Sequence, residues 1–114
     1  MKMKHVTINT AKMEESIRFY KEIVGLEMKV DMRNMGVPIV FLADGEDPCI
    51  ELIENPAQAY GGSGISIGFH AEDVEVKRAE LEEKGFAPTP MIQPNPHTKF
   101  FFIKDPNGVT IQFI

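Results

Sequence analysis

The sequence predicts an α+β fold made of two copies of a β-α-β-β-β module, and three observations support this prediction. Apolar and polar residues alternate over short segments, which is typical of strands with one buried face. Apolar residues recur at helical spacing in two segments, 12–24 and 74–84. The polar, Gly-rich segment 55–64 separates two stretches with the same order of elements. We expect modules 1–54 and 65–114, joined by this linker, to form a single domain, because so short a unit buries little surface alone.

The first module is predicted to begin with a strand at 5–9, where Val6 and Ile8 share one face and polar residues share the other. A helix is expected over 12–24, and Gly25 suits its left-handed end. The apolar stripe of this helix consists of Met13, Ile17, Tyr20 and Val24. The remaining strands of the module are predicted at 28–33, 37–43 and 49–54.

The second module is predicted to begin with an alternating strand at 65–71. Asp73 is a suitable N-cap for a helix over 74–84, and Gly85 suits the end of that helix. The turn sequence DPNG at 105–108 precedes the last strand. The remaining strands are predicted at 86–92, 98–104 and 109–114.

Composition and charge limit the partners of this protein. The 114 residues are 43% hydrophobic and 25% charged, and the net charge of −5 leaves no basic surplus for a nucleic-acid backbone. No apolar run reaches the roughly 20 residues of a membrane span, and the N-terminal residues lack a signal-peptide stretch. One cysteine, Cys49, excludes an internal disulfide. We expect a cytoplasmic protein that binds a neutral or cationic small molecule, and neither nucleic acid nor membrane.

Four phrases of the sequence resemble the vicinal oxygen chelate superfamily, which includes glyoxalase I, bleomycin-resistance proteins and extradiol dioxygenases. They are HVTINTAKMEESIRFYKEIVGLE, CIELIE, ISIGFHAEDV and FFFIKDPNGVTIQFI. The resemblance covers essentially the whole chain. It implies that the two βαβββ modules form a cupped, barrel-like mixed sheet with the helices outside. It also implies a homodimer, formed side by side or by module exchange.

The resemblance also implies a site for a divalent metal (Ni, Zn, Co, Mn or Fe) on the inner face of the cup. Its ligand positions match His5, Glu51, Ser66 and Gln112 in this sequence. Serine is a poor ligand for a transition metal, so the expected metal ligands are His5, Glu51 and Gln112. In glyoxalase-like members a ligating glutamate also transfers the proton. Because a glutamine cannot take up a proton at neutral pH, the catalytic base would be Glu51.

Further polar and aromatic residues are expected to line a ligand pocket. Thr7 and Asn9 share the strand face of His5, and His70 shares that of Ser66, although it lies roughly 13 Å further along the strand. Alternate residues of FFFI must face the cup, so an aromatic wall is expected there. The expected pocket residues are Thr7, Asn9, Ser66, His70 and Phe101.

Two classes of function fit these residues. The first is a metal-dependent lyase or isomerase, similar to lactoylglutathione lyase, that acts on a small carbonyl compound or a thiol adduct of one. The second is a non-catalytic protein that binds a drug or metabolite, as bleomycin-resistance proteins do. Ser66 and Gln112 fit the second class, and the acidic balance then favours a cationic ligand. A third interpretation is a degenerate copy whose partner chain supplies the missing groups.

Overall fold

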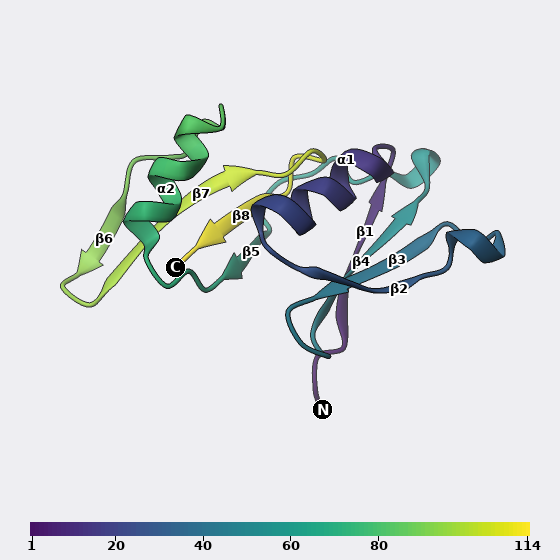
Figure 1. The fold of residues 1–114 in the computed structure, drawn as a ribbon. Coiled ribbons are helices and arrows are strands. Elements are labelled where there is room, and N and C mark those ends of the chain that lie inside the picture. The colour runs from purple at the N-terminus through teal and green to yellow at the C-terminus, as the bar shows by residue number, and fades with distance from the viewer. The chain divides into compact units, whose positions relative to one another are not determined.

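The computed structural model describes residues 1–114 and confirms the predicted α+β fold with two βαβββ modules. The chain divides into two compact units, Met1–Gly61 and Gly62–Ile114 (Figure 1). Each unit contains one four-stranded mixed sheet. The boundary between the units lies inside the Gly-rich segment 55–64.

The first unit has the strand order β1-β4-β3-β2, with β1 parallel to β4 and the other neighbours antiparallel. Its strands are β1 (His5–Thr10), β2 (Glu27–Asp31), β3 (Ile39–Ala43) and β4 (Cys49–Glu54). Its helical segments are α1 (Met13–Arg18), a π-helical turn (Phe19–Ile23) and two 3-10 turns (Arg33–Met35 and Pro56–Gln58). The predicted helix over 12–24 is therefore α-helical only in its first part.

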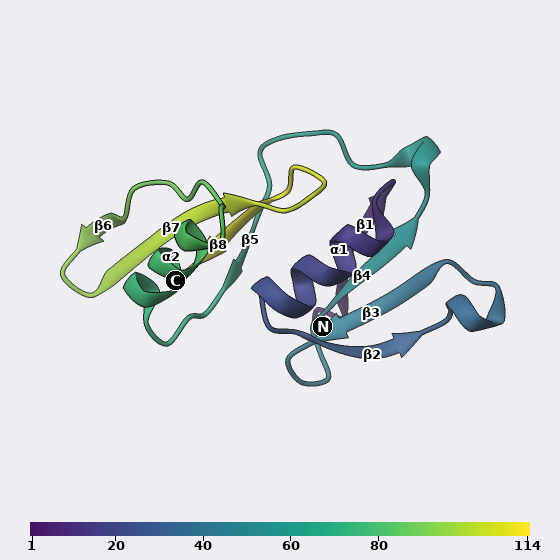
Figure 2. The ribbon, with the colours of Figure 1, turned by 45° about the horizontal axis from the view of Figure 1, so that its top comes forward.

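One face of this sheet carries the core of the first unit. The residues that alternate into it include Ile8, Val40, Leu42, Ile50 and Leu52, and all of them are buried. Helix α1 packs against β4 on this side (Figure 2). The apolar stripe predicted from the sequence therefore packs on the sheet, and Tyr20, which belongs to the π-helical turn, is completely buried. No α-helix of this unit covers the opposite face, the open face of the sheet.

The second unit repeats this arrangement with the strand order β5-β8-β7-β6. Its elements are β5 (Ser66–Phe69), α2 (Val74–Glu83), β6 (Ile92–Asn95), β7 (Thr98–Lys104) and β8 (Thr110–Phe113). The predicted N-cap is present, because Asp73 Oδ1 accepts a hydrogen bond from Val76 N at 3.0 Å. Leu81 is the completely buried residue of α2.

The strand predicted at 86–92 is placed differently, because β6 begins only at Ile92. Pro88 and Pro90 lack the backbone N–H that a strand donates to its neighbour. Only Thr89, between them, bonds to β7: its N–H donates to the Phe102 oxygen at 3.0 Å, and its hydroxyl accepts from Phe102 N at 3.0 Å.

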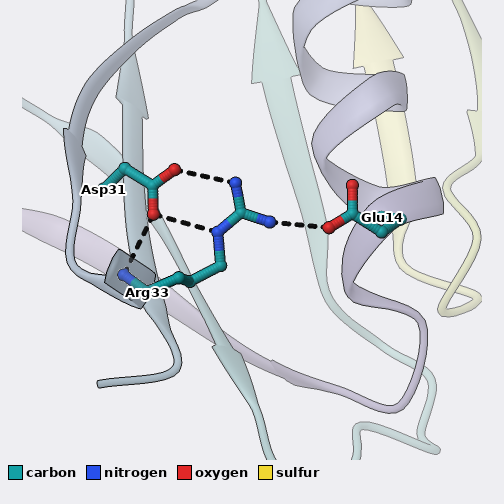
Figure 3. A network of polar contacts seen from close by, with 3 residues as sticks. All are labelled: Glu14, Asp31 and Arg33. Carbon is teal, nitrogen blue, oxygen red and sulfur yellow. Dashed lines mark hydrogen bonds and ion pairs between the residues drawn. The ribbon is translucent and has the colours of Figure 1, made fainter. Parts of the chain in front are cut away.

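A charged network ties the start of α1 to the turn after β2 (Figure 3). Arg33 donates to Asp31 through Nε at 2.9 Å and through Nη2 at 2.7 Å. Its third nitrogen, Nη1, donates to Glu14 Oε1 at 2.6 Å. Hydrogen bonds from the Arg33 side chain and backbone lower the pKa of Asp31 to about 2.

None of the helices has the length and apolar character that crossing a bilayer requires.

The first prediction concerns the core of the second unit. Leu81→Ala removes a completely buried side chain and should lower the free energy of unfolding by roughly 2–5 kcal/mol, since it leaves a cavity. Urea unfolding followed by circular dichroism measures this loss. Val76→Ala on the same helix is the matched control, because Val76 is 61% exposed and its truncation should change stability by less than about 0.5 kcal/mol. Equal losses in the two variants would contradict the assigned core.

The second prediction concerns the acid titration of Asp31. Arg33→Gln should raise the pKa of Asp31 from about 2 part of the way toward 3.8, because the backbone bond from residue 33 remains. Folding lowers this pKa, so ionised Asp31 favours the folded state above about pH 4, and that contribution is lost as the pH falls through 2. Carboxyl ¹³C NMR titration measures the pKa directly. Glu14→Gln is the control and should leave Asp31 low; an unchanged pKa in Arg33→Gln would contradict the assignment.

Candidate functional site

The register of the first sheet brings three predicted site residues together on its open face. In the parallel pair of β1 and β4, His5 stands opposite Cys49 and Thr7 stands opposite Glu51. Residues in directly opposed positions share a face of the sheet, as do residues two positions apart in a strand. His5, Thr7 and Glu51 therefore lie on one face, opposite the face that α1 covers.

Glu51 is at the centre of this group. Its Oε1 lies 3.5 Å from His5 Nε2, and the same oxygen accepts a hydrogen bond from the Thr7 hydroxyl. Phe41 stands opposite Glu51 on β3, and its ring meets the His5 imidazole edge to face, with 5.7 Å between centroids. These neighbours leave the glutamate residue only 9% exposed. A buried carboxylate needs such polar partners, because burying an isolated charge costs much free energy.

Both contacts of the Glu51 carboxylate are made by one oxygen. Oε2 makes no hydrogen bond to the protein, yet no buried polar side-chain atom in the structure lacks a partner. Oε2 is therefore accessible from the open face. The carboxylate thus presents one fixed oxygen and one free oxygen, which is a suitable arrangement for a base or a ligand.

A hollow of about 540 Å³ adjoins this group within the first unit. Its lining includes Lys4, His5, Lys29, Phe41, Asp47 and Cys49. The Lys4 ammonium donates to Asp47 at 2.9 Å, which lowers the pKa of the Asp47 carboxyl and raises the pKa of Lys4. The Cys49 thiol donates to the Glu46 backbone oxygen at 2.9 Å. The volume lies in the range of small-molecule pockets.

The second unit carries the equivalent positions with different chemistry. Gln112 stands opposite Gly68 on β5 and opposite Phe102 on β7, as Glu51 stands opposite Thr7 and Phe41. Ser66 occupies the position that His5 has in the first unit, two residues before Gly68. A smaller hollow of about 250 Å³ lies beside Ser66 and Phe102. The second unit therefore offers a neutral amide and a hydroxyl at these positions.

The remaining predicted pocket residues lie in different surroundings. Asn9 is half-buried on β1, and its Oδ1 accepts a hydrogen bond from Asn55 at 3.4 Å. His70 follows the end of β5 and is exposed.

The prediction that Phe101 lines the ligand pocket is wrong, because Phe101 does not lie on the open face. Its side chain is completely buried, and its ring packs against Phe113 with 5.5 Å between centroids. The aromatic residue that shares the face of Gln112 is Phe102, directly opposite it in register. Pairing of Ile103 with Ile111 fixes this alternation. In the sequence, the polar Gln112 between two apolar residues of β8 indicates which face of this sheet is polar.

The donor chemistry of His5 and Glu51 fits two ligands of one divalent ion. With metal–ligand bonds of about 2.1 Å, two tetrahedral ligands stand about 3.4 Å apart, close to the 3.5 Å found here. Catalytic zinc sites normally have three protein ligands. Within either unit no three His, Cys, Asp or Glu side chains converge, and Gln112 belongs to the second unit. Each unit alone therefore provides an incomplete metal site.

Three solved structures illustrate the similarity of this fold to known proteins. TnmS3, an antibiotic binding protein from Streptomyces sp. CB03234, matches with a TM-score of 0.79 and 22% identity over 99% of this chain and 93% of its own. The trypanothione-dependent glyoxalase I of Leishmania major matches with a TM-score of 0.78 and 24% identity over 100% and 86%. Lactoylglutathione lyase from Agrobacterium tumefaciens matches with a TM-score of 0.74 and 18% identity over 98% and 91%.

No curated protein matches the sequence. The family model described as "Glyoxalase/Bleomycin resistance protein/Dioxygenase superfamily" matches residues 2–113, nearly the whole chain. With two βαβββ modules and a matching sequence profile, this chain belongs to the glyoxalase/bleomycin resistance protein/dioxygenase superfamily.

Proposed function

We propose that this protein is a lyase or isomerase of glyoxalase type, acting on a small carbonyl compound or a thiol adduct of one. The observation that carries the proposal is the approach of His5 Nε2 to Glu51 Oε1 at 3.5 Å, beside a hollow large enough for a small molecule. Glu51 is the catalytic base of this proposal. The proposal includes a homodimer, and sedimentation velocity measures the oligomeric state directly.

Each residue of the first unit has a defined part in this chemistry. Glu51 takes a proton from the substrate through its free Oε2, while the Thr7 hydroxyl holds Oε1 by a hydrogen bond. Phe41 and the neighbouring apolar wall of the hollow hold the non-reacting part of the substrate. A divalent ion, when bound, stabilises the developing oxyanion. His5 and Glu51 would hold this ion, and Gln112 is the third proposed ligand.

A second candidate function is non-catalytic binding of a drug or metabolite. It is favoured by the neutral side chains at Ser66 and Gln112, which replace stronger metal ligands. TnmS3, a protein with the same fold, is an antibiotic binding protein. In this case the same hollow receives the ligand, and the Glu51 carboxylate beside Phe41 attracts a cationic group.

The third prediction tests the metal-dependent lyase. After removal of metal and dialysis against Ni²⁺, Zn²⁺, Co²⁺, Mn²⁺ and Fe²⁺, the parent protein should retain a divalent ion. His5→Ala and Glu51→Ala should lose it, because each removes one of the two converging donors. Elemental analysis of the dialysed protein measures bound ions per chain.

Matched controls for this experiment are His97→Ala and Glu54→Ala. Both residues are exposed, and Glu54 makes no hydrogen bond or ion pair with His5, Thr7 or Glu51. Each control should retain the parent's metal content. A parent protein without bound metal would contradict the metal-dependent proposal and favour the binding protein.

The fourth prediction tests the binding protein. Metal-free protein should bind a cationic aromatic compound without turnover, and Phe41→Ala should weaken binding roughly 5-fold, since an aromatic contact is worth about 1 kcal/mol. Isothermal titration calorimetry in EDTA measures the affinity. Phe100→Ala, in the second unit, is the control and should bind as the parent does. Binding that requires a metal ion would contradict this candidate.

A further inference from the structure

The two units differ in the residue that the first strand places opposite the polar residue of the last strand. Thr7 on β1 stands directly opposite Glu51 on β4. Gly68 on β5 stands directly opposite Gln112 on β8. A residue with a hydroxyl faces the carboxylate in the first unit, and a residue without a side chain faces the amide in the second.

The Thr7 hydroxyl donates to Glu51 Oε1, the oxygen that also faces His5. Threonine is β-branched, so its χ1 rotation is restricted on a strand. The donor therefore starts from a rigid position, and a hydrogen bond to an ionised acceptor is about twice as strong as one between neutral groups. This contact fixes Oε1 and turns Oε2 toward the open face.

Gln112 has no such partner on β5. A Cβ atom placed on Gly68 would lie only 2.9 Å from Gln112 Oε1. Real Cβ contacts are longer than this, so the amide occupies the space that a side chain at position 68 would need. The missing side chain at Gly68 thus allows the Gln112 amide to lie across β5.

We propose that Thr7 is the positioning residue of Glu51 and that Gly68 is the permissive position for Gln112. This inference rests on the proposed function, because it assigns Thr7 a role toward the glutamate that acts there. The first unit then provides a charged group held in one orientation. The second unit provides a neutral amide whose orientation depends on the absence of a side chain.

The first test measures the orientation of Glu51 without any ligand. The ¹³C carboxyl resonance of Glu51, assigned with Glu51→Gln, should move in Thr7→Val, which keeps the shape and loses the hydroxyl. Thr7→Ser should restore the parent resonance, because it keeps the donor. Thr98→Val is the matched control on β7 and should leave the resonance in place. An unchanged resonance in Thr7→Val, or a failure of Thr7→Ser to restore it, would overturn the role of Thr7.

The second test measures Ni²⁺ affinity by calorimetry on the same variants. Partners of metal-ligating side chains typically change affinity 10- to 100-fold, so Thr7→Val should weaken Ni²⁺ binding by roughly that factor and Thr7→Ser should not. Equal Ni²⁺ affinities of the parent and Thr7→Val would overturn the positioning role. If the parent binds no Ni²⁺, the metal-dependent proposal fails, and the carboxyl resonance alone decides the role of Thr7.

The third test concerns Gly68. Gly68→Ala should shift the side-chain ¹H–¹⁵N resonances of Gln112, because the added methyl group displaces the amide. The urea midpoint should change little, since the displaced atom is the end of a flexible side chain. Unchanged Gln112 amide resonances would overturn the role of Gly68.

Discussion

The parallel register of β1 against β4 positions the polar groups of the candidate site. It places Thr7 opposite Glu51 and His5 opposite Cys49, so that an imidazole, a hydroxyl and a carboxylate meet on one face. A shift by one residue would turn Glu51 toward α1 and bring Ile50 and Leu52 to the open face. The apolar residues under α1 therefore hold the polar residues in place, because the burial of one set fixes the orientation of the other.

The same register recurs in the second unit, where it positions a different set of groups. Gln112 stands opposite Gly68 and Phe102, as Glu51 stands opposite Thr7 and Phe41. The backbone arrangement is thus repeated, while only the first unit has a carboxylate at the compared position, Glu51 against Gln112. Repetition of a fold does not impose repetition of its chemistry, since side chains on the open face contribute little to the core.

The sequence predicted those features that depend on strong local signals. The apolar patterns at His5–Thr10 and Cys49–Glu54 identify two strands, and the capping residue Asp73 identifies the start of α2. The helical stripe over 12–24 identifies α1, although the last part of that segment is a π-helical turn. Phe101 was misplaced because three consecutive phenylalanines carry no alternation, and only the pairing of β7 with β8 decides which of them is buried. The contact between Thr7 and Glu51 also depends on long-range register, which no local pattern contains.

The burial of Glu51 limits how the open face can be interpreted. The Glu51 side chain is only 12% exposed and loses much of its hydration, and one hydroxyl with one histidine at 3.5 Å compensates only partly. An apolar side chain at position 51 would avoid this cost, as Ile53 does two residues later on the same strand. A strand that accepts such a residue beside an open hollow is less stable than the fold allows, as is expected where a site binds or transforms a ligand.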